Sequence, residues 1–325
     1  MKNALFLCCV IAFFSCEKEL QNTKLSGAVF GTSYNFIYHS DVNYQKEFDS
    51  LFYVLNKSLS TYQTNSDISK INKNEEVEID DHFIKVYDTS KEIFERTEGA
   101  LDPTIGNVVN AWSFGAEEAM KDIDSIKIDS LMRYVGFNKT KRKDRIIEKE
   151  HPNIYFEFNA LAKGYGVDVI SEFLEKKGVE NYLVEIGGEI RAKGKNVEKK
   201  SPWKVGVERP HFDGNQSILK AIRIKDAAMA TSGTYRKFKV DKDGNRYSHI
   251  IDTKTGFSSK TNLLSISVIA ADCMTADAYA TAFKTMGIEK VKAFLKEHPE
   301  LKVFLIFENT NKEFETLALN GFPES

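Results

Sequence analysis

The chain has 325 residues, of which 42% are hydrophobic and 28% charged, the balance of an ordinary globular protein. Its formal net charge is −2, and its lysines are interspersed with acidic residues rather than gathered in a stripe. This pattern lacks the basic footprint of a nucleic-acid-binding protein, so we expect no nucleic-acid partner.

The N-terminal stretch MKNALFLCCVIAFFSC has the pattern of an export signal. A lysine precedes an apolar run that is too short to span a bilayer as a helix. Ser15 and Cys16 at its end resemble a bacterial lipobox, in which the cysteine is lipidated, although Phe13 stands where leucine is usual. The stretch is therefore excluded from the folded domain.

We expect a signal peptide over residues 1–15, a lipidated tether over 16–26 and one continuous domain over 27–325, with the lipid on Cys16. Plain secretion and a retained anchor are the alternatives. The expected location is the bacterial cell envelope, where the chain would be anchored by lipid and face the periplasm or the exterior. Only Cys273 would remain as a free thiol, which excludes an intrachain disulfide in the mature chain.

Helices are predicted in four stretches by apolar side chains at helical spacing or by a glycine stop. In chain order these cover residues 44–62, 81–99, 163–177 and 271–287.

Strands are predicted from apolar runs and from alternation of apolar and polar residues. They are NYLVEIGG, the segment with Trp203, Val205 and Val207, LKAIRIK, LLSISVIAA and LKVFLIF. FKVDKDGNRYSHII reads as two strands joined at an Asp-Gly turn. This order of elements predicts an α+β fold with largely antiparallel sheets and flanking helices.

The stretch GALDPTIG places Asp102 before a proline. The functional interpretation is that the backbone from Ala100 to Asp102, including Leu101, contacts a ligand while the carboxylate orients a polar ring edge. The alternative is that Asp102 or Thr104 only caps a helix start.

The stretch FEFNALAKGYGVDV brings Glu157, Asn159 and Lys163 to the passage from a strand into a helix. A lysine at a helix start suits a phosphate group, because free backbone amides and the helix dipole already favour an anion. A solvated lysine beside a packing glycine is the alternative.

Small and hydroxyl-bearing residues mark two further stretches. Gly187 and Gly188 follow a strand and indicate either a bulge or a close approach of backbone. Thr231, Ser232 and Gly233 have the composition of a hydroxyl-rich turn of the kind that surrounds phosphates. His249 lies at the end of a predicted strand, where a structural role is the alternative to a functional one.

The predicted helix ADCMTADAYATAFKTMG carries Asp277 and Thr281, which share a face because they are four residues apart. A buried carboxylate needs a cation or hydrogen-bond donors. A carboxylate, a hydroxyl and a backbone carbonyl form an all-oxygen set that suits Mg²⁺. The alternatives are a helix-start role for Asp277 and a hydrogen bond from Thr281 to the preceding turn.

Taken in order, these stretches resemble the ApbE family, the FAD:protein FMN transferases, from about Gly27 to Gly287. The resemblance rests on GTSY, STYQTNSDISKIN, GALDPTIG, ALAKGYGVD, EIGGEI, ATSGTYRKF, YSHIIDTKTG and ADAYATAF. It implies a T-fold-like architecture and an enzyme that binds FAD with Mg²⁺, transfers FMN to a threonine or serine of an acceptor protein, and releases AMP.

The resemblance also implies site residues. The metal would be held by Asp277, Thr281 and the backbone oxygen of Ala160. Flavin contacts would fall at Phe30, Tyr62, Ala100, Leu101, Asp102, Glu157, Lys163 and His249.

Departures from the family pattern fall at three of these positions. The family usually has aspartate and glycine at the positions of Glu157 and Asn159, and often methionine at that of Phe30. For the base that activates the acceptor hydroxyl, Asp277 ranks ahead of His249, although a metal-bound carboxylate is a poor base.

Two other functions remain open at this point. One is an enzyme of the same fold that hydrolyses FAD to FMN and AMP with water. The other is a non-catalytic flavin-binding lipoprotein. For a lipid-anchored transferase, the natural acceptor is a protein of a membrane redox complex.

Overall fold

The computed structural model describes residues 21–121, 123–235, 238–240 and 246–324. Cys16, and with it the expected signal peptide and lipid site, lies outside these residues. Among the described residues, no helix is both long enough and apolar enough to cross a membrane.

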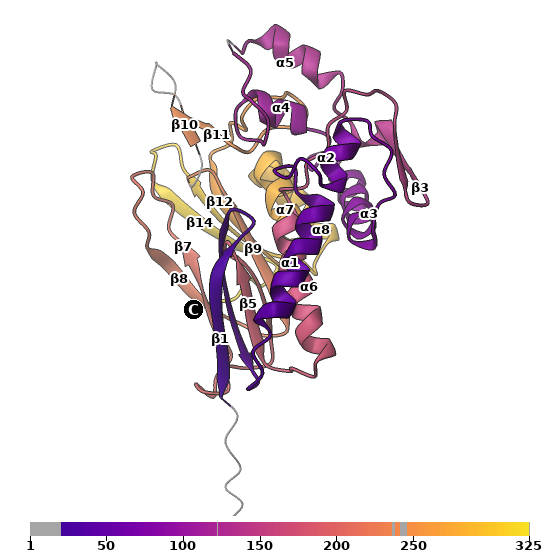
Figure 1. Cartoon of the computed structure of the whole chain (residues 1–325). Coiled ribbons are helices and arrows are strands. Elements are labelled where there is room, and N and C mark those ends of the chain that lie inside the picture. Colours follow the sequence, from indigo (N-terminus) through magenta and orange to yellow (C-terminus); the bar gives the residue numbers. More distant parts are fainter. Residues whose placement is uncertain (1–20, 122, 236–237, 241–245, 325) are drawn as a thin grey trace, which may run out of the picture.

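An eight-stranded sheet forms the centre of the molecule (Figure 1), and every pair of neighbouring strands in it is antiparallel. Its strands, in spatial order, are β1 (Asn22–Val29), β2 (Thr32–His39), β5 (Tyr182–Ile186), β6 (Glu189–Lys193), β9 (Ala227–Gly233), β12 (Leu263–Ala270), β13 (Lys302–Glu308) and β14 (Phe314–Leu319).

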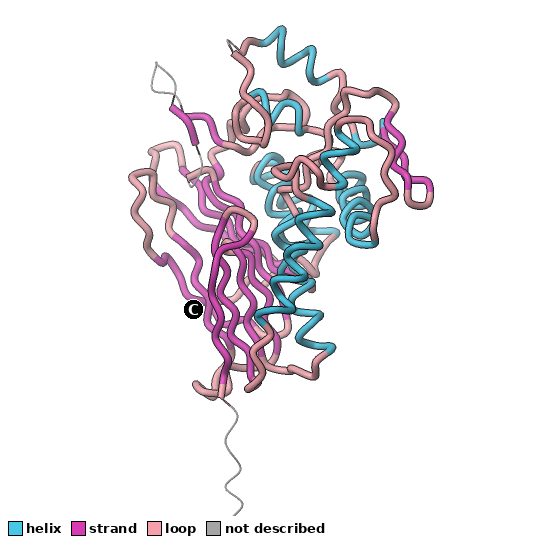
Figure 2. The backbone as a smooth tube through the Cα atoms, viewed as in Figure 1, coloured by secondary structure: helices cyan, strands magenta, loops and turns pink. Residues whose placement is uncertain are grey.

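Helices cover one face of this sheet, as the cyan coils along one side of the magenta strands show in Figure 2. The helices of the chain are α1 (Gln45–Leu59), α2 (Asp67–Asn72), α3 (Asp81–Arg96), α4 (Gly106–Ala111), α5 (Ser125–Met132), α6 (Ala162–Lys176), α7 (Cys273–Met286) and α8 (Ile288–Glu297), with a 3-10 turn at Phe137–Lys139.

The opposite face is covered by a hairpin of β7 (Trp203–Glu208) and β8 (Ile218–Ile224). Trp203 and Ile222 of this hairpin pack with Met229, Ile269 and Phe304 of the central sheet in one buried cluster. The sheet therefore has apolar cores on both faces, which explains why all eight residues of β12 are buried.

Two smaller hairpins lie outside these layers: β3 (Thr140–Lys143) with β4 (Ile146–Lys149), and β10 (Phe238–Val240) with β11 (Arg246–Ser248). The second pair confirms the two strands expected in FKVDKDGNRYSHII, whereas the Asp-Gly turn expected between them lies outside the described residues. Figure 1 shows this pair at the same end of the molecule as α4.

The predicted helices follow from their apolar periodicity. In α1, Phe48, Phe52, Leu55 and Leu59 recur at helical spacing and are all buried. The start of α3 is fixed by Asp80, whose side chain accepts a hydrogen bond from the amide of the third helical residue. The expected α+β fold with largely antiparallel sheets and flanking helices is confirmed.

The structure corrects one expected boundary. The tether was predicted to run to residue 26, but β1 begins at Asn22 and pairs with β2 from its first residue, opposite His39. The polar composition of this stretch suits an edge strand as well as a tether, because one side of an edge strand faces solvent.

Candidate functional site

Three charged side chains meet where α6, β6 and α7 come together. The ammonium of Lys163 lies 2.6 Å from Oε1 of Glu189 and 3.8 Å from Oδ2 of Asp277. Both carboxylates are buried, each with 3% of its surface exposed, whereas the lysine is partly exposed. With two acids against one base, this cluster can accept a further positive charge.

The charges in this cluster shift one another's proton affinity. Burial alone would lower the pKa of Lys163, but the carboxylates of Asp277 and Glu189 outweigh it and raise that pKa, so the amine stays charged. Burial raises the pKa of Asp277, the charge of Lys163 opposes that rise, and the charge of Glu189 adds to it. A cation near Asp277 would therefore stabilise its ionised form.

Gly164 allows this close meeting of α6 and α7. A Cβ at this position would lie 2.8 Å from the Cβ of Asp277 and would collide with the carbonyl group of Cys273. Without it, the amide of Gly164 donates a hydrogen bond of 3.0 Å to Oδ2 of Asp277. Gly164 therefore has the packing role that the sequence offered as the alternative to a phosphate site.

Hydroxyl groups lie near the end of strand β9, on both faces of the sheet. The hydroxyls of Ser232 and Thr281 are 3.2 Å apart, and those of Thr231 and Ser267 are 2.7 Å apart. The prediction of a turn at Thr231, Ser232 and Gly233 is wrong, because these residues end strand β9 and pair with β12. Backbone pairing here overrides the local turn preference of serine and glycine.

The predicted metal set can be tested against these contacts. Asp277 and Thr281 lie one turn apart on α7, and Ala160 lies one turn before Gly164, whose amide bonds Asp277. Among the described residues there is no group of three or more His, Cys, Asp or Glu that could hold a metal. The set expected from the sequence offers one carboxylate, one hydroxyl and one carbonyl oxygen, a composition that suits Mg²⁺ better than zinc.

The Ala100–Asp102 segment is tied to the end of α7, since the hydroxyl of Thr285 donates to the carbonyl of Ala100 at 3.3 Å. The carboxylate of Asp102 is buried and accepts hydrogen bonds from the amide and hydroxyl of Thr104 and from the amide of Phe137. Burial raises the pKa of Asp102, and these hydrogen bonds partly offset the rise. The carboxylate thus fixes a local turn, and α4 begins at Gly106 without a side-chain cap.

The flavin contacts predicted at Glu157 and Tyr62 lie close together. The amide of Asn159 donates to Oε1 of Glu157 at 3.1 Å. Burial, followed by the charge of Glu157, raises the pKa of Tyr62, and a hydrogen bond with Asn159 opposes the rise. The amide of Glu157 also bonds the carbonyl of Pro103 at 2.8 Å, which brings the segment next to Ala100–Asp102.

Two predicted flavin contacts stand at loop positions. Phe30 has a positive φ of 49° in the β1–β2 turn, and its ring packs edge-on against Phe52 with centroids 5.6 Å apart. His249 directly follows β11, and its ring contacts Phe114 with centroids 6.3 Å apart. Both residues are partly exposed, as ligand contacts should be.

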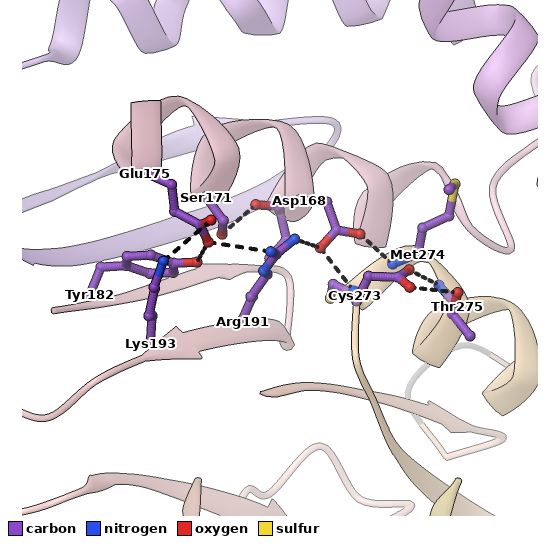
Figure 3. Close-up of polar contacts among 11 residues, drawn as sticks. Asp168, Ser171, Glu175, Tyr182, Arg191, Lys193, Cys273, Met274 and Thr275 are labelled. Carbon is purple, nitrogen blue, oxygen red and sulfur yellow. Dashed lines mark hydrogen bonds and ion pairs between the residues drawn. The ribbon is translucent and has the colours of Figure 1, made fainter. Parts of the chain in front are cut away.

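Two acidic residues of this region were missed by the sequence analysis. Glu189 stands directly after the glycine pair of EIGGEI, and Asp168 ends the motif ALAKGYGVD. Figure 3 shows Asp168 between Arg191 and the first residues of α7. Asp168 could have been suspected, because it is the one carboxylate in the apolar and small-residue stretch GYGVDVI. Glu189 shares its motif with Glu185, so composition alone did not single it out.

Comparisons with known proteins identify the family of the chain. The sequence model of the ApbE family matches residues 30–305. A FAD:protein FMN transferase of Haemophilus influenzae is 36% identical over 330 residues, with 97% of this chain and 94% of the relative covered. Another of Vibrio cholerae serotype O1 is 35% identical over 334 residues, covering 99% and 98%.

Solved structures show the same likeness. The flavin transferase ApbE from Vibrio cholerae has a TM-score of 0.83 and 34% identity, with 92% of this chain and 97% of that chain covered. The apo form of a flavinyl transferase ApbE from Pseudomonas stutzeri has a TM-score of 0.81 and 26% identity, covering 92% and 95%. Sequence and structure agree over nearly the whole length, and the chain belongs to the ApbE family.

Proposed function

We propose that this chain transfers FMN from FAD to a threonine or serine hydroxyl of an acceptor protein and releases AMP. The observation that carries the proposal is the meeting of Lys163 and Asp277 where α6 starts against α7. It lies in a chain that matches FAD:protein FMN transferases over nearly its full length. Splitting a pyrophosphate builds negative charge on its oxygens, which such a cluster can stabilise with a cation.

Asp277, Thr281 and the carbonyl of Ala160 would hold Mg²⁺. The donors are all oxygen, and the two acids beside the single ammonium leave the cluster short of positive charge. When bound, Mg²⁺ would supply charge stabilisation to the phosphate oxygens of FAD.

Lys163 would contact the same phosphate oxygens. Glu189 holds the ammonium of Lys163 at 2.6 Å, and the raised pKa keeps this amine charged. Lys163 would therefore act as a fixed positive charge and not as a group that gives up its proton. The Ala100–Asp102 backbone, Glu157 and Tyr62 would then bind the flavin end, since these segments are joined through the Glu157–Pro103 hydrogen bond.

His249 is better suited than Asp277 to remove the proton from the acceptor hydroxyl. The carboxylate of Asp277 is buried, and its Oδ2 already accepts the amide of Gly164. His249 is partly exposed on a loop, and imidazole is the side chain that most often serves as a general base. The order of preference drawn from the sequence is therefore reversed.

Lipidation at Cys16 would anchor the enzyme in the bacterial cell envelope, facing the periplasm or exterior, where a protein of a membrane redox complex could serve as the acceptor. The support is the lipobox-like sequence before Cys16. The intact mass of the mature chain tests this part: a mass that lacks residues 1–15 and includes diacylglycerol and a fatty acyl group is expected, and an unmodified full-length mass would contradict it.

The transfer itself is tested with FAD, Mg²⁺ and a flavin-accepting protein, whose Thr→Ala variant is the control. We expect a fluorescent band on a denaturing gel and one AMP released per flavin attached. AMP release without a fluorescent band would instead indicate a FAD hydrolase. Tight FAD binding without AMP release would indicate a non-catalytic flavin-binding protein.

A further inference from the structure

The N-terminus of α6 is capped by a residue of α7. Leu161 precedes α6 and offers no side-chain cap. The first amides of a helix have no partner inside the helix. The amide of Gly164 is satisfied by Asp277, which reaches across from α7 with an N–O distance of 3.0 Å.

The N-terminus of α7 is capped in return by a residue of α6. Asp168 accepts the amide of Cys273 with Oδ1 at 2.9 Å and that of Met274 with Oδ2 at 2.8 Å. The helix also has its own cap, because Asp272 accepts the amide and hydroxyl of Thr275. Asp168 is therefore not needed to start α7. What it adds is a fixed position of that start against α6.

Asp168 is itself held from the sheet, as Figure 3 shows. Arg191 donates to its Oδ1 at 2.8 Å and reaches Glu175 at 3.3 Å. Glu175 in turn accepts the hydroxyl of Tyr182 at 2.6 Å and lies 3.4 Å from the ammonium of Lys193. The carboxylate of Asp168 is 4% exposed, so this chain of contacts leaves it little freedom to move.

We propose that Asp168 is a positioning residue for Asp277. Four residues separate Asp168 from Gly164 on α6, and four separate Cys273 from Asp277 on α7, so the two capping contacts are one helical turn apart on both helices. A slip of α7 by the rise of one residue, about 1.5 Å, would break the bond from Gly164 to Asp277. The inference rests on the proposed function, in which Asp277 binds the metal.

Asp272 provides a matched control. It caps the same helix end as Asp168, but its contacts stay within α7. If Asp168 only stabilised the start of the helix, Asp168→Asn and Asp272→Asn would have the same effects. If it positions Asp277, only Asp168→Asn will disturb the contact between Asp277 and Gly164.

Two measurements on the full chain separate these cases. The first is hydrogen exchange of the Gly164 amide, which needs neither metal nor substrate. The second is calorimetric titration of Mg²⁺ into the FAD-loaded chain, with thermal unfolding recorded for each variant. Changes to residues that orient metal ligands typically weaken metal affinity by about 10–100-fold.

We expect Asp168→Asn to speed exchange at Gly164 about tenfold or more and to weaken Mg²⁺ binding about tenfold, while Asp272→Asn changes both less than about twofold. Equal effects of the two variants on both measurements, or no effect of Asp168→Asn, would overturn the proposal. If the parent chain binds no Mg²⁺, the proposed metal site fails, and the exchange at Gly164 still decides the positioning role.

Arg191→Lys covers the case in which Asp168→Asn does not fold. It keeps both carboxylate–amide hydrogen bonds of Asp168 and loosens only the hold from β6. We expect Arg191→Lys to speed exchange of the Gly164 amide as Asp168→Asn does, but by a smaller factor of about two to three. Exchange equal to that of the parent would contradict the proposal.

Discussion

The two halves of α7 treat buried charge differently. In the first half, Asp277 has the amide of Gly164 and the ammonium of Lys163 as partners. In the second half, Lys284 is fully buried, and its ammonium donates to the hydroxyl of Thr261 at 2.9 Å. Burial lowers the pKa of Lys284 to about 8. A buried charge with several charged or amide partners marks the candidate site, whereas one held by a single hydroxyl mainly costs stability.

Replacing the charge in the first half should have the largest effect. Asp277→Asn keeps the size and one acceptor for Gly164 but removes the negative charge, so we expect FMN transfer to fall about a thousandfold. Transfer is measured by the fluorescence of the acceptor band, with thermal unfolding as the control for folding. If the variant keeps a tenth or more of the parent's transfer rate, Asp277 is not a ligand of the catalytic metal.

The asparagine is preferred to alanine for a structural reason. The structure places Asp277 in the interior, where it caps α6. Alanine would leave the Gly164 amide without an acceptor, so a loss of activity could then reflect a loss of structure.

Replacing the charge in the second half of α7 should improve the protein's stability instead of impairing its function. Lys284→Met removes a buried ammonium, and we expect the variant to be more stable than the parent by roughly 2–3 kcal/mol at pH 7. Activity should be unchanged, since no predicted ligand contact involves this side chain. Urea unfolding of both proteins measures the difference.

The pH dependence of this difference follows from the shift in proton affinity. The pKa of Lys284 falls from 10.5 to about 8 on folding, so between these values the unfolded chain binds more protons. The parent therefore gains stability from this group as the pH rises above about 8, and the advantage of Lys284→Met should shrink there. Lys292→Met, at an exposed lysine, is the control. An advantage that does not change with pH would contradict this, because it would mean that folding leaves the pKa of the amine at its ordinary value.

The close packing of α6 against α7 at Gly164 brings Asp277 to its partners. Gly164→Ala places a Cβ against the Cys273 carbonyl and 2.8 Å from the Cβ of Asp277, so the backbones must separate. We expect a loss of about 2 kcal/mol in the free energy of unfolding and weaker Mg²⁺ binding. Gly166→Ala is the control on the same helix, because its Cβ would meet the ring of Phe30, a side chain that can turn aside. Equal losses for both variants would contradict a specific role for Gly164.

The sequence was sufficient to predict much of the fold. Apolar periodicity identified α1, α3, α6 and α7, and alternation or apolar runs identified β5, β7, β8, β12 and β13. Five strands of the central sheet were not predicted: β1, β2, β6, β9 and β14. For two of them the physical reason is clear, because the edge strand β1 can be polar and the small residues of β9 are typical of a turn. Pairing with neighbours, which local sequence does not specify, decides both cases.

The candidate site was predicted only in part. Helical spacing placed Asp277 and Thr281 on one face, and the motif before α6 indicated Lys163. Glu189 and Asp168 could not be assigned, because their roles depend on how α6 and β6 meet α7. Spacing within one element says which residues share a face, but not which element that face will contact.

Glu189 gives the finest test of the comparison, because it asks whether the charge or only the hydrogen bond at the site matters. Its Oε1 binds Lys163 at 2.6 Å, while its buried Oε2 has no hydrogen-bond partner among the described residues. Glu189→Gln keeps an acceptor for the ammonium and removes the charge. We expect kcat/KM for FAD to fall about tenfold, equivalent to roughly 1.4 kcal/mol.

The matched exchange is Glu148→Gln, at an exposed pair with Lys143, where we expect no measurable change. If Glu189→Gln keeps the parent's kcat/KM, a hydrogen bond is enough to hold Lys163, and the net charge of the cluster does not contribute to binding the metal. If the activity of Glu189→Gln falls while its stability rises, the charge of Glu189 contributes to function and destabilises the fold. The charge of Lys284, by contrast, is expected to destabilise the fold without contributing to function. The two halves of α7 would then differ in what their buried charges do, and not only in how many partners they have.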